Sequence, residues 1–323
     1  MLSVSPIVVS CTRPSPPAPG FRVALMTPGS VSDAGWNASA FDGLVLVRNR
    51  LGAGISLVQT SSPADFENAM RDFALRGFNL VFAHGFEYTD AALTVGQSFH
   101  ATTFVVTSGA GSSGNVASLG FRLEEATWIE GVLAGGMSKT GIVGEVGGIN
   151  IPQIAITFDA FKRGFLSVRP TGKVLLTYTG SFNDVGAAKE AALTEIGQGA
   201  DMLFHDADQA GLGVFQAAVQ SHVFAFGIIR DQAAVAPDNI VASAVSEVPL
   251  AFLKIATEVK SRDFHPAMIE YGMRDGMVRV VYNPVLMAKI PAAALANANR
   301  VEADIMAGRL PVDALLAQAK SGN

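Results

Sequence analysis

The sequence predicts an α/β protein made of two doubly wound parallel-sheet lobes around a ligand cleft. Nine short apolar runs, rich in β-branched and aromatic residues, alternate with amphipathic segments along residues 21–245. Continuous apolar strands separated by helices are typical of parallel sheets covered on both faces. Nine strands are too many for one compact open sheet with short connections, so we expect a division near residue 120.

The individual elements follow from this alternation. The expected strands are 21–27, 55–60, 79–84, 103–108, 141–147, 173–180, 201–206, 223–228 and 239–245. The expected helices are 62–77, 124–140, 184–199 and 246–264, and the segment 268–283 is strand-rich. We expect 21–120 plus about 240–275 to form the first lobe, and 121–239 plus about 276–323 the second.

The composition excludes several classes of function. Hydrophobic residues make up 49% and charged residues 16% of the chain, which is typical of a well-packed globular protein. The formal net charge is −5 and there is no basic run, which argues against nucleic acid or an anionic membrane surface as a partner. Five histidines and one cysteine lie without metal-ligand spacing, so we expect neither a metal site nor another cofactor.

The N-terminal segment 1–20 suggests a signal and a tether. Val8, Val9 and Ser10 precede Cys11 as in a bacterial lipobox, whose cysteine is lipidated, and a Pro-rich spacer follows. A secretory peptide also has a basic region and about 7 to 15 apolar residues, and no Lys or Arg precedes Cys11. The alternatives are a start further upstream or an ordinary disordered N-terminus.

The loops that follow the expected strands describe a polar and aromatic cleft with few permanent charges. They read "PGSVSDAGWN", "HGFEYTDAA", "SGAGSSGN", "GGINIP", "GSFND", "HDADQAGLG" and "IIRDQ". Ligands bind at the carboxyl ends of strands in open α/β sheets, so these loops should line the site. The "GAGSSG" stretch matches a dinucleotide fingerprint, but the extended-looking "NVASLGF" follows it instead of a helix, so we reject that interpretation.

Six blocks in order resemble the basic membrane protein family of substrate-binding lipoproteins, whose purine nucleoside receptors serve ABC importers. They are "VALMTPGSVSDAGWN", "NLVFAHGFEYTDAA", "FVVTSG", "NVASLGFRLEEATWIEGVLAGGMSKTGIVGEVGG", "VLLTYTGSFNDVGAAKEAA" and "GADMLFHDADQAGLGVF". The resemblance covers nearly the whole chain from Phe21. It implies a type I periplasmic-binding-protein fold, with two lobes that close about a hinge on a ligand.

The resemblance also implies a ligand site. Trp36 and Phe204 would sandwich a base from opposite lobes, and Asp33 and Asn37 would read its edge. The further expected ligand-binding residues are Gly85 and Phe86, as backbone and wall of the cleft, and Asp231.

Two departures from the family pattern affect the sugar half of that site. Relatives commonly read "GVDSDQ" where this chain has "GIIRDQ", so the first acid is Ile229 here. A lysine common in relatives is Ser246. Charge-assisted hydrogen bonds to ribose hydroxyls are worth about 1.5 to 3 kcal/mol each, so their loss makes a free purine base as plausible as a nucleoside.

Simpler structural interpretations stand beside these. Trp36 would pack against its own lobe, Asp33 would cap a helix, and Phe204 would belong to the core. Asp231 would pair with Arg230 or with another residue of its lobe. Asp206 and Asp208 are expected to cap the helix that begins near Ala210, and His84 and His205 to be structural.

The sequence therefore predicts a solute-binding protein, not an enzyme, that captures a purine base or nucleoside for an ABC permease. Its expected location is the periplasm or the outer face of the cytoplasmic membrane. We expect a monomer that meets the membrane only through its lipid anchor and binds no nucleic acid. The alternatives are a cytoplasmic ligand sensor of the same fold and an enzyme acting on nucleosides. The first has no room for a DNA-binding motif before Phe21, and the second lacks a cluster of catalytic partners.

Overall fold

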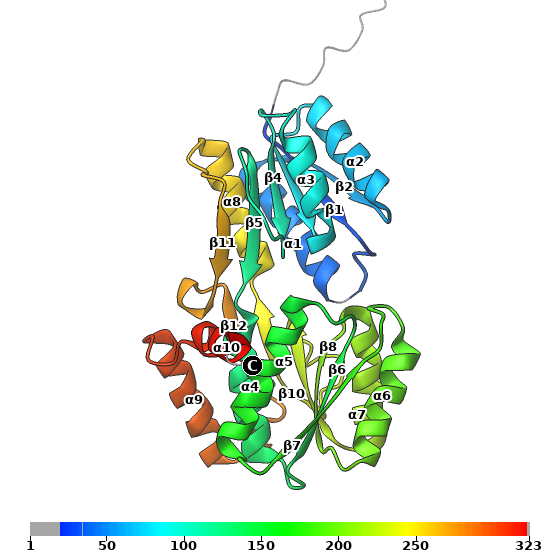
Figure 1. Ribbon diagram of the computed structural model, residues 1–323, viewed down its shortest axis with the longest axis vertical. Coiled ribbons are helices and arrows are strands. Elements are labelled where there is room, and N and C mark those ends of the chain that lie inside the picture. Colours follow the sequence, from blue (N-terminus) through cyan, green and yellow to red (C-terminus); the bar gives the residue numbers. More distant parts are fainter. Residues whose placement is uncertain (1–19, 34, 322–323) are drawn as a thin grey trace, which may run out of the picture.

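Two six-stranded sheets, one in each lobe, carry the fold of the computed structural model, which describes residues 20–33 and 35–321 (Figure 1). The first sheet has the order β11-β5-β4-β3-β1-β2, and all its strands are parallel. The second has the order β12-β10-β9-β8-β6-β7, with only β12 antiparallel to its neighbour. This confirms the predicted pair of doubly wound lobes.

Nine of the twelve strands agree with the expected runs to within one or two residues at most ends. β5 was not among the expected strands, and β11 and β12 lie in the segment described as strand-rich. The first sheet contains β1 (Arg22–Thr27), β2 (Gly54–Gln59), β3 (Leu80–His84), β4 (Thr103–Thr107), β5 (Val116–Phe121) and β11 (Met268–Tyr271). The second contains β6 (Ile142–Gly147), β7 (Lys173–Tyr178), β8 (Met202–Asp206), β9 (Phe224–Ile229), β10 (Ile240–Ser246) and β12 (Val278–Tyr282).

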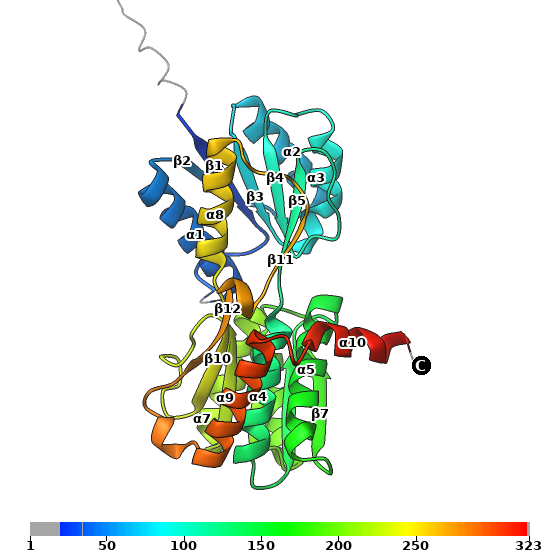
Figure 2. The same cartoon turned by 90° about the vertical axis from the view of Figure 1, so that its left-hand side faces the viewer.

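Helices cover both faces of each sheet, as Figure 2 shows from the side. Those of the first lobe are α1 (Trp36–Leu51), α2 (Pro63–Leu75), α3 (Thr89–Gly96) and α8 (Val248–Ser261). Those of the second are α4 (Leu123–Met137), α5 (Pro152–Val168), α6 (Val185–Gly197), α7 (Gly211–Ser221), α9 (Ala292–Met306) and α10 (Val312–Ser321). The hydrophobic core is accordingly divided into one cluster on each face of each sheet.

The helices α4 and α5 pack closely because glycines lie where they cross. A side chain at Gly131 would meet the carbonyl oxygen of Phe161, and one at Gly164 would meet that of Trp128. The whole of α4 is therefore nearly buried between the second sheet, α5 and α9.

The lobe boundary predicted at about residue 240 is wrong. β10 pairs with β9 and β12, so it is an interior strand of the second sheet, and every one of its residues is buried. The chain returns to the first lobe only afterwards, where α8 packs on α1. The segment is a strand, as predicted, but hydrophobicity alone does not show which of the two sheets a strand joins.

Three chain segments join the lobes: β5 to α4, β10 to α8, and β11 to β12. Backbone hydrogen bonds tie them together, from Arg122 N to the oxygen of Tyr271 and from Glu247 N to the oxygen of Met277. The side chain of Arg122 also contacts Glu125 and Asp275. These crossings form the hinge region.

The predicted lipobox, Cys11 and most of the tether lie outside the described residues. Within the described part of the chain, no helix combines the length and apolar character needed to cross a membrane.

Candidate functional site

A cleft of about 630 Å³ lies between the lobes, where the carboxyl ends of both sheets face each other. Small-molecule pockets commonly measure roughly 300–1,000 Å³. The first lobe contributes Pro28, Gly29, Trp36, Asn37, Gly85, Phe86, Glu87, Ser108 and Gly109. The second contributes Ile151, Pro152, Gln153, Ile154, Ile156, Thr157, Phe182, Asn183, Asp206, Asp208 and Ile229. The walls are therefore mixed apolar and polar, as the strand-end loops predicted.

Trp36 is the first residue of α1, and it lines the cleft. Its indole stacks on the imidazole of His84, with ring centroids 3.9 Å apart and planes inclined by 23°. His84 Nε2 donates to the carbonyl oxygen of Trp36 at 3.0 Å, because a carbonyl can only accept. The hydroxyl of Thr107 then donates to His84 Nδ1 at 2.8 Å. Both ring nitrogens are satisfied, so His84 is structural, as expected, and it holds Trp36 in position.

Burial keeps this support uncharged. It lowers the pKa of His84 to about 3, against a weaker opposing effect of the hydrogen bond to Trp36. The imidazole is therefore neutral at physiological pH, and the stacked pair carries no charge into the cleft.

Asp33 and Asn37 form one hydrogen-bonded unit at the N-terminus of α1. The carboxylate of Asp33 accepts from the backbone N–H groups of Gly35, Asn37 and Ala38 at 2.7–3.0 Å. It also accepts from the side-chain amide of Asn37 at 2.7 Å. Asp33 is 5% exposed and does not line the cleft, so it serves as a cap rather than as the predicted reader of a ligand.

Asn37 does line the cleft, as predicted. Its amide nitrogen is committed to Asp33, so the orientation of the side chain is fixed by that carboxylate. Its Oδ1 atom is buried and has no hydrogen-bond partner among the described residues. An unpaired buried acceptor is costly, so a donor N–H that reached this oxygen would be stabilised.

Gly85 and Phe86, predicted as backbone and wall, both line the cleft. Gly85 has φ +154°, and a side chain there would run into the carboxylate of Glu87. Phe86 is 43% exposed, an unusual state for a large apolar ring. Both residues follow β3, so the end of that strand supplies an open apolar wall.

Phe204 lies in the core of the second lobe, and the predicted Trp36–Phe204 sandwich is wrong. Its ring is fully buried and stacks on Phe161, with centroids 4.8 Å apart and planes inclined by 11°. Successive strand residues point to opposite faces of a sheet, and Phe204 is directed toward α5, within the core cluster that also holds Met202. Phe204 therefore belongs to the strand itself and not to the loop that follows it, and its side chain does not line the cleft.

Phe182 is the aromatic residue of the second lobe that lines the cleft. It lies in the "GSFND" loop after β7, and its ring packs over Gly148, where no side chain displaces it. The signal for it was present in the sequence, because that loop was among the strand-end loops expected to line the site.

Asp206 and Asp208 line the second-lobe side of the cleft. The expectation that they cap the following helix is wrong, because neither side chain makes a cap hydrogen bond there. The hydroxyl of Thr157 donates to Asp206 at 2.8 Å, and the backbone N–H of Trp36 donates to Asp208 at 3.2 Å. Burial is the main cause that raises the pKa of both carboxyl groups to about 7, and for Asp208 the nearby charge of Asp33 contributes to the same shift. Near neutral pH, each group is therefore able to donate as well as accept a hydrogen bond.

Ile229 lines the cleft at the end of β9 with φ +72°. β-Branched residues rarely adopt that conformation, and strain of this kind costs on the order of 1–3 kcal/mol and clusters at functional sites. Ser246 is buried and does not line the cleft; its hydroxyl lies 3.5 Å from the carbonyl oxygen of Ile229. The position at which the family resemblance led us to expect an acid is therefore apolar here.

Asp231 points away from the cleft. It is exposed, and its carboxylate accepts from the backbone N–H of Ala233 at 3.0 Å. The expected pairing with Arg230 is also wrong, because Arg230 instead pairs with Asp42 of α1 at 2.9 Å.

The lobes touch across the cleft as well as at the hinge. Besides the Arg230–Asp42 ion pair and the Trp36–Asp208 hydrogen bond, the amide of Gln153 donates to the carbonyl oxygen of Ser108 at 3.2 Å. Such contacts belong to a closed arrangement of two lobes.

The hinge end of the cleft is acidic, which the sequence did not reveal. Glu124, Glu270 and Asp313 line it together with Arg122. Burial is the main cause that raises the pKa of Glu124 to about 7, and the neighbouring Glu125 contributes to the same shift. Across the described residues, no cluster of three or more His, Cys, Asp or Glu side chains has the arrangement of a metal site.

Two lobes that close over a mixed apolar and polar cleft at their hinge define a solute-binding protein. Residues 21–312 match the model of the Bmp family, described as ABC transporter substrate-binding protein PnrA-like, and the chain belongs to that family. Members of this class bind a small molecule outside the cytoplasm and deliver it to a permease, so transport rather than catalysis is the role of the family.

Individual relatives agree with this assignment. The chain is 28% identical over 279 residues to basic membrane protein A2 of Borrelia garinii, covering 82% of this chain and 81% of the relative. It is 26% identical over 292 residues to a purine-binding protein of Brucella abortus, covering 90% and 82%. A solute-binding protein structure from an ABC transporter system of Aeropyrum pernix superposes with a TM-score of 0.83 at 20% identity, covering 94% of this chain and 98% of that one. The structural likeness confirms the predicted two-lobed fold.

Proposed function

We propose that this protein is an extracytoplasmic receptor, anchored through Cys11, that binds a purine base or purine nucleoside and delivers it to an ABC importer. The flat ring system stacks on Trp36, and closure of the lobes encloses it. Closure is favoured because the ligand gains contacts with the second lobe only in the closed state.

The observation that carries the proposal is the adjacency of Trp36, which lines the cleft, to Asn37, whose Oδ1 has no hydrogen-bond partner within the described part of the chain. A planar heterocycle on the indole places its edge near this oxygen, which accepts from an exocyclic amine or ring N–H. Aromatic stacking contributes about 0.5–1.5 kcal/mol beyond the burial of area. Phe182, in place of the expected Phe204, is the aromatic residue that the opposite lobe contributes. The Brucella abortus relative, a purine-binding protein, supports the same ligand class.

The apolar surface of Ile229 supports a free base over a nucleoside. A ribose hydroxyl directed toward this side chain finds no charged partner on it, and a buried unpaired hydroxyl is unfavourable. Asp206 and Asp208 are the polar groups on the same wall. Because their pKa values are about 7, each can donate a hydrogen bond to a ligand or accept one from it near neutral pH.

Tryptophan fluorescence tests the proposal, because Trp36 and Trp128 are the two tryptophans of the chain. Trp128→Phe leaves only the cleft indole, and Trp36→Phe leaves only the buried Trp128 of α4 as a matched control. We expect adenine or guanine to quench the Trp128→Phe variant saturably, with little effect on Trp36→Phe. Ribose should quench neither. Saturation by ribose, or no quenching by any purine, would contradict the proposal.

A further inference from the structure

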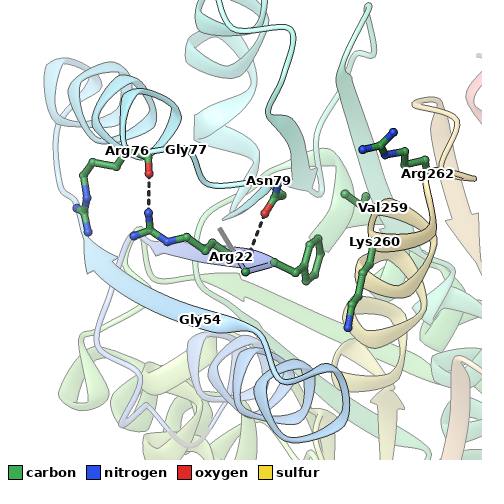
Figure 3. Close-up of a pocket in the computed structure, with 10 residues that line it drawn as sticks. Arg22, Gly54, Arg76, Gly77, Asn79, Val259, Lys260 and Arg262 are labelled. Carbon is green, nitrogen blue, oxygen red and sulfur yellow. Dashed lines mark hydrogen bonds between the residues drawn. The ribbon is translucent and has the colours of Figure 1, made fainter. Parts of the chain in front are cut away.

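The first sheet has a second pocket, of about 710 Å³, at the end that is farthest from the ligand cleft (Figure 3). We call this end of the sheet its amino edge. The pocket lies at the amino ends of the strands, whereas the ligand cleft lies at their carboxyl ends. Four cationic side chains line it: Arg22, Arg76, Lys260 and Arg262. Gly20, the first described residue, lines it too.

These cations meet because helices in βα units run antiparallel to the strands, so α1, α2 and α8 all end at this edge. Two of them satisfy the ends of helices. Lys260 Nζ donates to the carbonyl oxygen of Leu51 at 2.8 Å, and Arg22 donates to that of Arg76 at 2.5 Å. Basic side chains commonly stabilise helix C-termini in this way, which accounts for part of the cluster.

Helix capping does not account for the rest. Arg48 and Arg50, in the last turn of α1, and Arg262, just after α8, are exposed and have no carboxylate partner among the described residues. The six cations of this edge, which we call the basic end, are Arg22, Arg48, Arg50, Arg76, Lys260 and Arg262. Three carboxylates lie beside them: Asp72, Glu258 and Asp263. The basic end therefore carries a net charge of +3 in a chain whose formal charge is −5.

An apolar side chain projects from the same edge. Leu75, the last residue of α2, is 76% exposed, the largest exposed fraction of any large hydrophobic residue in the described chain. It is followed directly by Arg76. An apolar residue among cations is the combination with which peripheral proteins meet a lipid interface.

The chain enters the first lobe at this point. Residues 1–19, predicted to hold the lipidated Cys11, join the described chain at Gly20 in the pocket itself. The nine residues from Cys11 to Gly20 span at most roughly 30 Å when extended. An anchor at Cys11 would therefore hold this end of the first lobe close to the lipid.

We propose that the basic end docks on an anionic phospholipid surface, with Leu75 inserted between headgroups. The cations are spread over the ends of three helices and the start of β1, and Arg48 and Arg50 lie outside the pocket, which suits a charged plane better than a single small anion. Docking places the amino end of the first sheet against the membrane surface. This contact is additional to the lipid anchor, which the sequence had suggested as the only membrane contact.

Vesicle co-sedimentation tests the proposal. The full chain with Cys11→Ser removes any contribution from acylation. The vesicles contain either phosphatidylcholine alone or phosphatidylcholine with phosphatidylglycerol. The test variant is Arg48→Gln with Arg50→Gln and Arg262→Gln. The matched control removes three exposed cations from the second lobe, as Lys139→Gln with Lys173→Gln and Arg300→Gln. Thermal unfolding of each variant confirms that it is folded.

We expect binding only to the phosphatidylglycerol vesicles, with a strong decrease as salt is added. Each cation removed from a membrane-facing surface lowers binding by about fivefold, so the test variant should lose on the order of a hundredfold and the control far less. Leu75→Ser should also weaken binding while leaving its salt dependence intact. Equal losses in the two triple variants would overturn the proposal. Displacement by millimolar inorganic phosphate at constant ionic strength would assign the pocket to a free anion instead.

Discussion

Trp36 and Asn37 are consecutive residues, yet a different neighbour fixes each one. His84 stacks under the indole of Trp36, and Asp33 holds the amide of Asn37. Both supports are buried and contribute nothing to the cleft surface directly. Substitutions of the pair should therefore affect ligand binding, whereas substitutions of the supports should affect stability as well.

Replacing Trp36 with alanine should weaken purine binding strongly. The substitution removes both the stacking interaction and the buried apolar area of the indole, a loss on the order of a hundredfold in affinity. Trp36→Phe keeps a stacking face and should lose much less. Isothermal titration calorimetry measures both, and an unchanged dissociation constant for Trp36→Ala would place the ligand elsewhere.

Replacing Ile229 with aspartate should shift the preference from base toward nucleoside. A carboxylate at the end of β9 accepts from ribose hydroxyls, and charge-assisted hydrogen bonds of this kind correspond to roughly a 10- to 100-fold gain. Aspartate also tolerates the positive φ better than isoleucine. The measured quantity is the ratio of adenosine to adenine affinity. Ile229→Val is the apolar control and should leave that ratio alone; the same ratio in both variants would exclude a sugar subsite here.

The sequence located most of the cleft but not every side chain in it. Trp36, Asn37, Gly85 and Phe86 line the cleft because they lie beyond the ends of their strands. Phe204 does not, because it still belongs to β8 and its side chain follows the alternation of the strand into the core. The expected strand 201–206 already contained Phe204, so the wrong prediction came from the family resemblance and not from a misplaced strand end.

At the level of elements, the N-terminus of α1 receives carboxylates from both lobes. Asp33 accepts from three backbone N–H groups of the first turn, and Asp208 reaches across the cleft to the N–H of Trp36. The positive end of the helix dipole favours both. One element thus links the ligand-binding loop of the first lobe to the second lobe.

Loss of the carboxylate of Asp208 should let the lobes separate in the absence of ligand. Asp208→Ala removes the acceptor that Trp36 N–H uses, while Asp208→Asn keeps an acceptor oxygen in the same place. Small-angle X-ray scattering of the ligand-free protein should show a larger radius of gyration for the alanine variant than for the asparagine variant. Affinity should fall in proportion to the lost closed population. Equal radii for Asp208→Ala and the unmodified protein would show that this contact does not hold the lobes together.

The elements themselves were largely predictable, and their assembly was less so. Continuous apolar runs identified nine of the strands, and turn residues marked their ends. β10 was assigned to the wrong lobe because its sequence is equally suited to either sheet. The basic end was not predicted for a related reason, because its cations come from short, separate segments that only the fold brings together.

Across the whole molecule, buried titratable groups should make the ligand-free protein more stable at pH 5.5 than at pH 7.5. Burial raises four carboxyl pKa values to about 7, and their stabilising protonation is lost as pH rises through that value. Burial lowers the pKa of two histidines to about 3 and about 4. Their effect is opposite: below the usual histidine pKa the unfolded chain takes up protons that the folded chain does not, so acidification lowers the stability. The carboxyl groups are Glu124, Glu195, Asp206 and Asp208, and the histidines are His84 and His205.

The carboxyl groups outnumber the histidines, so the net free energy of unfolding should rise on acidification over this range. Urea unfolding at the two pH values measures it. Glu195→Gln removes one buried acid far from the cleft and should reduce the difference between them. Higher stability at pH 7.5 than at pH 5.5 would show that the histidines dominate.

The most direct test of the central claim is the identity of the molecule that the protein carries. Native mass spectrometry of the gently purified chain, followed by denaturing extraction, identifies any bound compound. We predict a purine. A free base such as adenine or guanine would support the role given to Ile229, whereas an intact nucleoside would support the purine site but not that role. A sugar, a peptide or another ligand without a planar heterocycle would contradict the stacking site at Trp36 and the function built on it.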